Sequence, residues 1–135
     1  MASIDTIRRL VELSHRADNV FIATTDRDRV PHMAAAGPLE LQAPDQIVVT
    51  AWFCPGTIKN LAGNKSISIV VWESANDSGY QIVGKVNRVS ASAMLNGYAP
   101  GVEGTRVYPQ VKQRLFIKVE QVLLFSIAPH GDIEA

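Results

Sequence analysis

The sequence predicts a mainly β domain of the α+β type, in which six antiparallel strands close into a small barrel with two or three short helices. One observation is a series of short apolar, β-branched runs bounded by turn residues, which is typical of strands. A second is the length of 135 residues with 47% apolar and 19% charged residues, which predicts one folded domain over residues 1–135. A third is that short turns join most runs, and closing such strands into a barrel removes exposed sheet edges.

The first half of the chain predicts one helix and three strands. Apolar residues at helical spacing, with Ser3 as a cap, predict a helix over residues 3–15. A β-branched run at 20–25, a polar turn at 26–29 and a second extended run at 30–41 predict a hairpin. After another turn, residues 47–52 predict a strand buried on both faces, so the three strands are expected to form a meander.

The second half predicts further strands with little helix between them. Residues 57–63 are helical in pattern, 67–72 alternate as a strand, 73–79 have loop composition, and 80–90 predict a strand. Gly84 inside that strand indicates a bulge, a bend or a close backbone approach. We expect a short helix at 91–96 and then a loop. A long final strand is predicted because apolar residues share one parity, namely Leu115, Ile117, Val119, Leu123, Phe125 and Ile127.

Composition excludes several classes of function. Lysine plus arginine and aspartate plus glutamate both number 13, so no overall field favours nucleic acid or a membrane surface. No apolar stretch approaches the roughly twenty residues of a membrane span, and the start of the chain is unlike a signal peptide, so a cytoplasmic location is expected. The single Cys54 cannot form an internal disulfide, and the three histidines are too widely separated in the sequence to predict a metal site. The glycine-rich motifs of dinucleotide-binding proteins and nucleoside triphosphatases are absent, so neither kind of site is predicted.

Residues 50–65 have the chemistry of an anion site. A Pro-Gly turn follows the strand, Thr57 can cap a helix, and the N–H groups of Ile58, Lys59 and Asn60 would then point outward with the positive end of the helix dipole. Lys59 adds a compact positive charge, so a phosphate monoester would fit. The alternative is that Thr57 only caps the helix and Lys59 only faces water.

The order and spacing of these segments resemble the FMN-binding split-barrel family, the pyridoxamine 5′-phosphate oxidase-like proteins. The segments that carry the resemblance are Val20–Thr25, Val30–Met33, Gln46–Thr50, Thr57–Asn64 and Gly79–Gly84. No single motif is strict, and the likeness covers nearly the whole chain. It implies a six-stranded antiparallel split barrel that forms a homodimer, with one FMN in each of two clefts between the subunits.

The resemblance also implies roles for individual residues. Residues 33–36 and 50–52 would line the isoalloxazine ring mainly through backbone groups, although small alanines also suit ordinary core packing. Thr57 and Lys59 would hold the phosphate, and Gln81 would border the cofactor together with Gly84. The implied cofactor-binding residues are Met33, Ala34, Ala35, Ala36, Thr50, Ala51, Trp52, Thr57, Ile58, Lys59, Asn60 and Gln81.

Departures from the family pattern limit the implied activity. The chain is shorter than true pyridoxamine 5′-phosphate oxidases and lacks their terminal Arg-Leu-x-Pro stretch, so oxidation of vitamin B6 is not expected. We expect an FMN-dependent oxidoreductase or flavin reductase with an unknown small substrate and no assigned catalytic residue. The alternatives are a flavin carrier or electron-transfer protein, and a relative that binds haem or a deazaflavin, for which His32 is the histidine of interest.

Overall fold

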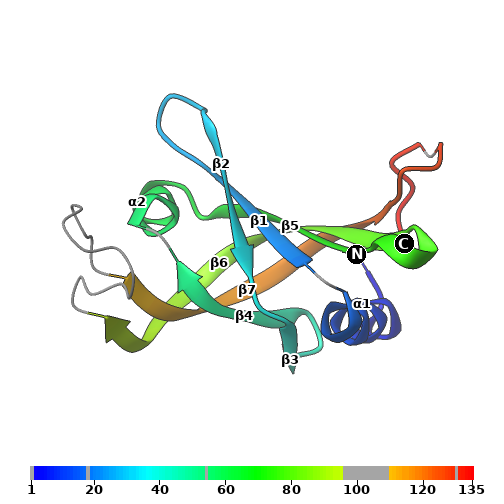
Figure 1. Ribbon diagram of the computed structural model, residues 1–135, viewed down its shortest axis with the longest axis horizontal. Helices are drawn as coiled ribbons and strands as arrows, with labels where there is room; N and C mark the ends of the chain where they lie inside the picture. The colour runs from blue at the N-terminus through cyan, green and yellow to red at the C-terminus, as the bar shows by residue number, and fades with distance from the viewer. Residues whose placement is uncertain (1, 18, 54, 96–109, 130) are drawn as a thin grey trace.

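The computed structural model describes residues 2–17, 19–53, 55–95, 110–129 and 131–135 (Figure 1). Within these ranges the chain forms one antiparallel sheet of seven strands, in the order β2-β1-β5-β6-β7-β4-β3, together with two α-helices and a short 3-10 helix. The predicted class is confirmed, with seven strands in place of six. The elements are α1 Ile4–Arg16, β1 Asn19–Thr25, β2 Pro31–Ala36, β3 Leu39–Ala43, β4 Gln46–Phe53, α2 Pro55–Gly63, β5 Ser66–Glu73, η1 Ser74–Asn76, β6 Ser78–Leu95 and β7 Gln110–Phe125.

The additional strand comes from a break in the run that was predicted as one strand over residues 30–41. β2 ends at Ala36 and β3 begins at Leu39, with Gly37 and Pro38 between them. Proline has no N–H to continue a ladder, and a Cβ on Gly37 would lie 2.8 Å from the Thr50 carbonyl oxygen. β2 therefore pairs with β1, while β3 pairs with β4 at the other edge of the sheet.

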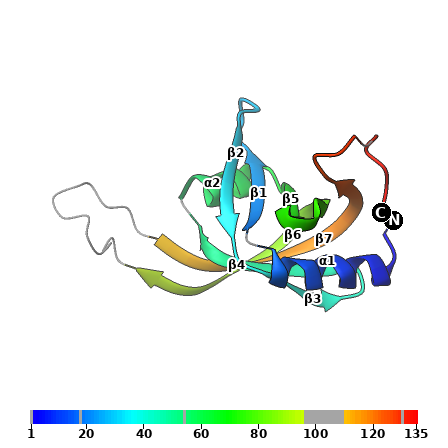
Figure 2. The same cartoon turned by 45° about the vertical axis from the view of Figure 1, so that its right-hand side comes forward.

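The predicted meander of the first three strands is wrong for the same reason. β4 pairs with β7 along its whole length, so strands far apart in the sequence become neighbours. The sheet curls until its two sides approach each other, and the Gly37 N–H donates to the Thr50 carbonyl oxygen at 3.3 Å. Figure 2 shows the resulting barrel from a second direction, with the long β6–β7 ribbon running along it.

Helix α1 packs across one side of the sheet. The predicted cap is confirmed, because Ser3 Oγ accepts a hydrogen bond from the Thr6 N–H at 3.2 Å. The buried face of α1 consists of Ile7, Leu10, Leu13 and Ser14. Because these residues recur at helical spacing, one face of α1 contributes to the core while the arginines of the other face remain exposed.

The hydrophobic core lies between the inner faces of the strands and the two helices. Alternate residues of most strands point inward, as expected for a sheet with one buried face. In β4 the consecutive residues Ile47, Val48 and Val49 are all buried, so the predicted burial of both faces holds for this part of the strand, with Val48 outside the core cluster. The largest fully buried side chains are Ile7, Leu10, Ile22, Leu39, Ile47, Val48, Leu61, Ile69, Ile82, Leu115 and Ile117. The interior is thus filled by aliphatic side chains of the sheet and helices, and functional groups must lie at the ends or on the outer face.

The β6–β7 ladder contains the predicted irregularity at Gly84. The register shifts between Val83 and Gly84, and a Cβ on Gly84 would lie 2.3 Å from the Lys118 carbonyl oxygen. Val83 pairs with Gln121 and Gly84 with Val119, so β7 contains one extra residue, Glu120, between these partners. The alternation of buried residues along β7 therefore changes after Val119, and Val122 is the next buried residue. The prediction of a single parity along the final strand is therefore wrong beyond Val119.

Two other predictions for the second half of the chain differ from the structure. The final strand was expected to reach Ile127, but β7 ends at Phe125 and the Ile127 side chain is exposed. The short helix predicted over 91–96 is wrong as far as residue 95, because β6 continues as a strand paired with β7 to Leu95. Asn96 lies outside the described residues. Pairing with a long partner strand overrides the weak local helical pattern.

Candidate functional site

Helix α2 closes the end of the barrel beside the β1–β2 hairpin and carries the predicted anion-binding segment. The helix begins at Pro55, so Thr57 lies in its first turn and the prediction of Thr57 as the cap is wrong. Proline favours the first helical position because its fixed φ suits the helix and the missing N–H has no intrahelical partner there. Consequently the N–H groups of Lys59 and Asn60 stand opposite the carbonyls of Pro55 and Gly56 and belong to the intrahelical ladder.

The Thr57 side chain points into the barrel. Thr57 is completely buried, and its Oγ1 lies 3.4 Å from His32 Nδ1 of β2. A Cβ on Gly56 would lie 3.3 Å from His32 Nε2, so the imidazole ring rests against the first turn of α2. The structure therefore places His32 beside the start of α2 as a packing partner for Thr57.

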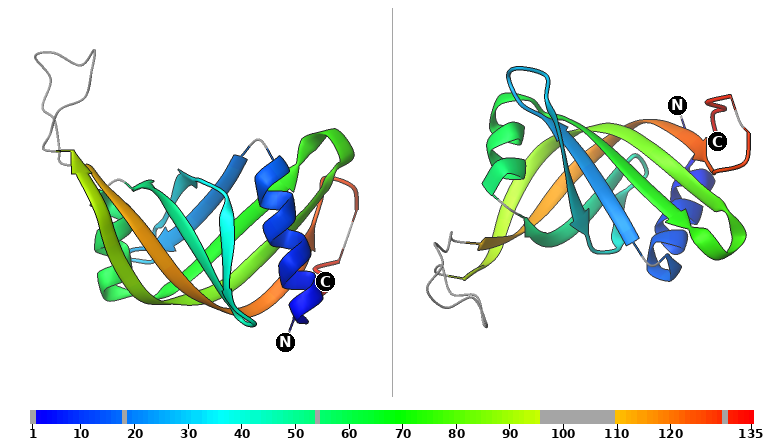
Figure 3. Two further views of the ribbon diagram at one scale, coloured as in Figure 1. Left: turned by 90° about the horizontal axis from the view of Figure 1, so that it is seen from below. Right: turned by 45° about the horizontal axis from the view of Figure 1, so that its top comes forward.

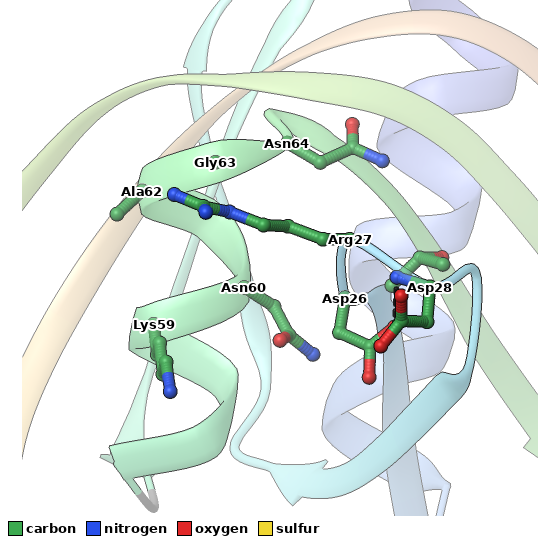
Figure 4. Close-up of a pocket in the computed structure, with 9 residues that line it drawn as sticks. Asp26, Arg27, Asp28, Lys59, Asn60, Ala62, Gly63 and Asn64 are labelled. Atoms are coloured by element: carbon green, nitrogen blue, oxygen red, sulfur yellow. Dashed lines mark hydrogen bonds between the residues drawn. The ribbon is translucent and has the colours of Figure 1, made fainter.

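Lys59 and Asn60 line a cavity of about 550 Å³ between α2 and the β1–β2 turn (Figure 4). Asn60 Nδ2 donates to Thr24 Oγ1 at 3.1 Å and so connects α2 to β1. Lys59 is exposed at the cavity. The full lining is Thr25, Asp26, Arg27, Asp28, Lys59, Asn60, Ala62, Gly63 and Asn64.

The β1–β2 turn contributes charges of both signs to this cavity. Asp26 Oδ1 accepts hydrogen bonds from the N–H groups of Asp28 at 2.8 Å and Val30 at 2.9 Å, so this carboxylate maintains the turn. Arg27 extends from the turn toward Ala62 and Gly63 of α2 (Figure 4). Sequence reasoning missed Arg27, because the alternating charges of 26–29 indicate only a polar turn until the hairpin is placed beside α2.

The segments predicted to line the ring come together where β2 approaches β4. On β2, Ala34 and Ala36 pack against the core, while Ala35 and Met33 face outward and Met33 is 63% exposed. On β4, Ala51 packs against the core, whereas Trp52 is 42% exposed. The core-packing alternative therefore describes the side chains of Ala34, Ala36 and Ala51, and the outward positions form a separate surface.

Gln81 lies apart from the other predicted residues. It is on β6, where Gln81 Nε2 donates to Ser68 Oγ of β5 at 3.0 Å. The order β2-β1-β5-β6 puts three strand spacings, about 14 Å, between β2 and β6. Gln81 thus shares the outer face of the sheet with Ala35 but does not reach α2.

A second cavity of about 380 Å³ opens on that outer face next to Met33. Asp77 fixes its wall, because Oδ1 accepts hydrogen bonds from Trp72 Nε1 at 3.0 Å and from the Ile127 N–H at 2.7 Å. The cavity is lined by Asn19, Phe21, Met33, Val70, Trp72, Ser74, Phe125 and Ile127. The outward aromatic residues Phe21 and Trp72, alternating with buried neighbours, were the only available signal in the sequence for this surface.

No helix in the described part of the chain is both long enough and apolar enough to cross a membrane. Within the same ranges, no group of three or more histidine, cysteine, aspartate or glutamate side chains is arranged to hold a metal ion.

Comparison with known proteins shows similarity at the level of the fold. The sequence matches no protein-family model and no curated protein. The crystal structure of HupZ from Group A Streptococcus superposes with a TM-score of 0.65 at 17% identity, covering 92% of this chain and 97% of that chain. An FMN-binding protein from Syntrophomonas wolfei gives 0.58 at 19% identity, covering 93% and 92%. An F420 reductase gives 0.58 at 13% identity, covering 82% and 93%. The chain therefore has the fold of the FMN-binding, pyridoxamine 5′-phosphate oxidase-like split-barrel proteins.

Proposed function

We propose that the protein is a cytoplasmic FMN-binding flavoprotein that acts as a homodimer, as an oxidoreductase or flavin reductase on a small substrate. The observation that carries the proposal is the convergence of α2, the end of β4 and the outward residues of β2 in a fold shared with FMN-binding proteins. Bound flavin would supply the capacity to accept and donate hydride or electrons, while the protein binds and orients the reactants.

Lys59 is the proposed partner of the flavin phosphate. It is exposed at the cavity, and Arg27 provides a second positive charge from the facing turn. The same turn contributes two carboxylates, of which Asp26 already accepts two backbone hydrogen bonds and Asp28 also lines the cavity. The two cations and two carboxylates balance over the cavity as a whole, and the proposal places the phosphate on the α2 side, at Lys59 and where Arg27 extends toward Ala62 and Gly63.

The ring would lie on the outward residues close to the β2–β4 approach. Met33, Ala35 and Trp52 provide exposed apolar surface there, with the small Ala35 allowing close approach of a flat ring. A second copy of the chain over the same face would complete an apolar slot and account for the proposed homodimer. Gln81 is not included in this slot because β1 and β5 separate its strand from β2.

The decisive experiment is a visible absorption spectrum of protein purified without added cofactor, followed by titration of FMN and of riboflavin by fluorescence. We expect quenching of FMN fluorescence and tighter binding of FMN than of riboflavin, because only FMN carries the phosphate. A colourless protein that quenches neither compound would refute the proposal. Turnover with a reduced nicotinamide would identify an enzyme, and bound flavin without turnover would identify a carrier.

A deazaflavin is the second candidate cofactor, and the fold shared with an F420 reductase is the observation that favours it. Mass analysis of the compound released by heating distinguishes the two cofactors directly. Release of a deazaflavin would change the identity of the ring, while the proposed roles of Lys59 and the β2–β4 surface would be tested with that compound in place of FMN.

A further inference from the structure

Four cations form a strip on the outer face of β6 and β7, away from the cavity at α2. The cationic strip consists of Lys85 and Arg88 of β6 and Arg114 and Lys118 of β7. Figure 3 shows the two strands side by side along the sheet. Residues of β7 that point outward recur about every 7 Å, so the strip is about 14 Å long from Lys118 to Arg114.

The two arginines are organised by one aromatic ring. The Arg88 guanidinium lies 3.8 Å from the centroid of Phe116, and the Arg114 guanidinium lies 5.2 Å from it. Phe116 is only 4% exposed. A guanidinium placed over an aromatic ring still has N–H groups available for an acceptor, and its fork of donors suits bidentate contact with a phosphoryl or carboxylate group.

The two lysines oppose each other directly. Lys85 and Lys118 are cross-strand partners, and like charges in that position destabilise a sheet. None of the four cations forms an ion pair with any described residue. Glu120 is the nearest carboxylate along β7, two residues from Lys118, and Glu40 and Asp45 are the nearest ones across the ladder. None of the three comes within 4.0 Å of a strip cation. An anionic ligand would relieve this repulsion.

The position of the strip connects it to the proposed flavin site. Arg114 is the cross-strand partner of Thr50, and cross-strand partners project from the same face. Thr50 and Trp52 are two residues apart on β4 and were both predicted to line the ring. The strip is therefore continuous with the outward surface of β4 beside that site.

We propose that the cationic strip binds a phosphoryl group of a second small molecule, namely the electron donor or acceptor that reacts with the flavin. The electron-transfer part of this proposal rests on the proposed function. Arg88 and Arg114 lie over Phe116, and the Lys85–Lys118 pair lies about 7 Å further along β7, so the strip offers two places for a phosphoryl group. Because Phe116 is covered, it offers no face on which the bases of a single-stranded nucleic acid could stack.

The test is calorimetric titration of the full-length protein with inorganic pyrophosphate, using Lys59→Ala to remove the proposed flavin-phosphate contact. We expect saturable binding in wild type and in Lys59→Ala. The Arg88→Gln and Arg114→Gln variants should each weaken it by about tenfold. Glutamine retains a planar head above Phe116, so the fold should survive the loss of charge. Arg9→Gln on the exposed face of α1 is the matched control and should bind like wild type.

Several outcomes would overturn the proposal while leaving the proposed function intact. One is the absence of saturable pyrophosphate binding in a wild-type protein that binds FMN. Another is equal pyrophosphate affinity in the strip variants and the Arg9→Gln control. Loss of the FMN preference over riboflavin in the strip variants would assign the strip to the flavin phosphate instead. A change in the oligomeric state of the strip variants in sedimentation, without a change in pyrophosphate affinity, would assign the strip to contact with a second copy of the chain.

A different outcome concerns the proposed function alone. Pyrophosphate binding in a protein that binds no flavin would refute the proposed function and leave the phosphoryl site in place.

Discussion

Helices α1 and α2 pack at different places on the same barrel, and their polar side chains have different partners. At α1, Ser14 Oγ accepts a hydrogen bond from the Leu39 N–H at 2.9 Å, and His15 Nε2 donates to the Leu39 carbonyl oxygen at 3.0 Å. Both side chains thus satisfy backbone groups at the start of β3. The polar side chains of α1 therefore stabilise the folded state, because a buried backbone N–H without a hydrogen-bond partner lowers the free energy of unfolding.

At α2 the polar contacts join side chains to side chains. Asn60 donates to Thr24, and Thr57 lies against His32, while Lys59 is exposed beside a cavity. These contacts position α2 relative to the hairpin and leave a charged group accessible to a ligand. The comparison indicates that changes at α1 should alter the free energy of unfolding, whereas changes at α2 should mainly alter ligand binding.

The largest effect on stability is expected for Leu10→Ala at the α1 end. Leu10 is completely buried, so truncation removes apolar contacts and leaves a cavity. The free energy of unfolding should fall by about 3 kcal/mol in urea denaturation. The ratio of FMN to riboflavin affinity should stay at the wild-type value, and a changed ratio would show that the two ends are coupled.

Ser14→Ala should have the next largest effect, also on stability. Loss of the hydroxyl removes the acceptor for the Leu39 N–H in a buried position and should lower the free energy of unfolding by about 2 kcal/mol. Ser66→Ala, at an exposed position, is the control for loss of a serine hydroxyl. Equal stability of the two variants would contradict the role assigned to Ser14.

Lys59→Ala should affect ligand binding and not stability. FMN affinity should fall by about 2 kcal/mol because a charge-assisted contact to the phosphate is lost, while riboflavin affinity should be unchanged. Fluorescence titration of both compounds provides the measurement. Lys65→Ala, which removes an exposed lysine just beyond α2, should bind both compounds like wild type. Equal weakening of FMN and riboflavin would remove Lys59 from the phosphate role.

Asn60→Ala should have the smallest effect, divided between stability and binding. The hydrogen bond to Thr24 is lost, so the free energy of unfolding should fall by about 1 kcal/mol. FMN affinity should fall less than in Lys59→Ala, because only the position of α2 relative to the hairpin changes. Asn87→Ala at an exposed position of β6 serves as the control in thermal denaturation and FMN titration. A loss of stability equal to that of Leu10→Ala would show that α2 is as integral to the core as α1.

Much of the fold could be predicted because it depends on local patterns. The Ser3 cap, the apolar spacing of α1 and the irregularity at Gly84 follow from residues close together in the sequence. The break at Gly37 and Pro38 was also visible in the composition, but its consequence was not. Only the pairing of β4 with β7 shows that the chain leaves one edge of the sheet and joins the other.

The candidate site follows the same division. Proline, glycine, threonine and lysine at 55–59 indicated a helix start with a cation from the sequence alone, although its boundary was displaced by two residues. Arg27 could not be assigned to it, because its position depends on a hairpin that folds beside α2. The stacking of Arg88 and Arg114 on Phe116 likewise joins two strands whose register no local pattern specifies.

The sequence by itself determined most of the strands and helices, because alternation, capping and turn chemistry act over a few residues. Residues 91–95 are the exception, since pairing with β7 makes them part of a strand. The tertiary structure alone decided which strands are neighbours and which side chains share a face. Those relations depend on how a curved sheet buries its apolar surface as a whole, and a one-residue bulge such as that at Gly84 is sufficient to change them.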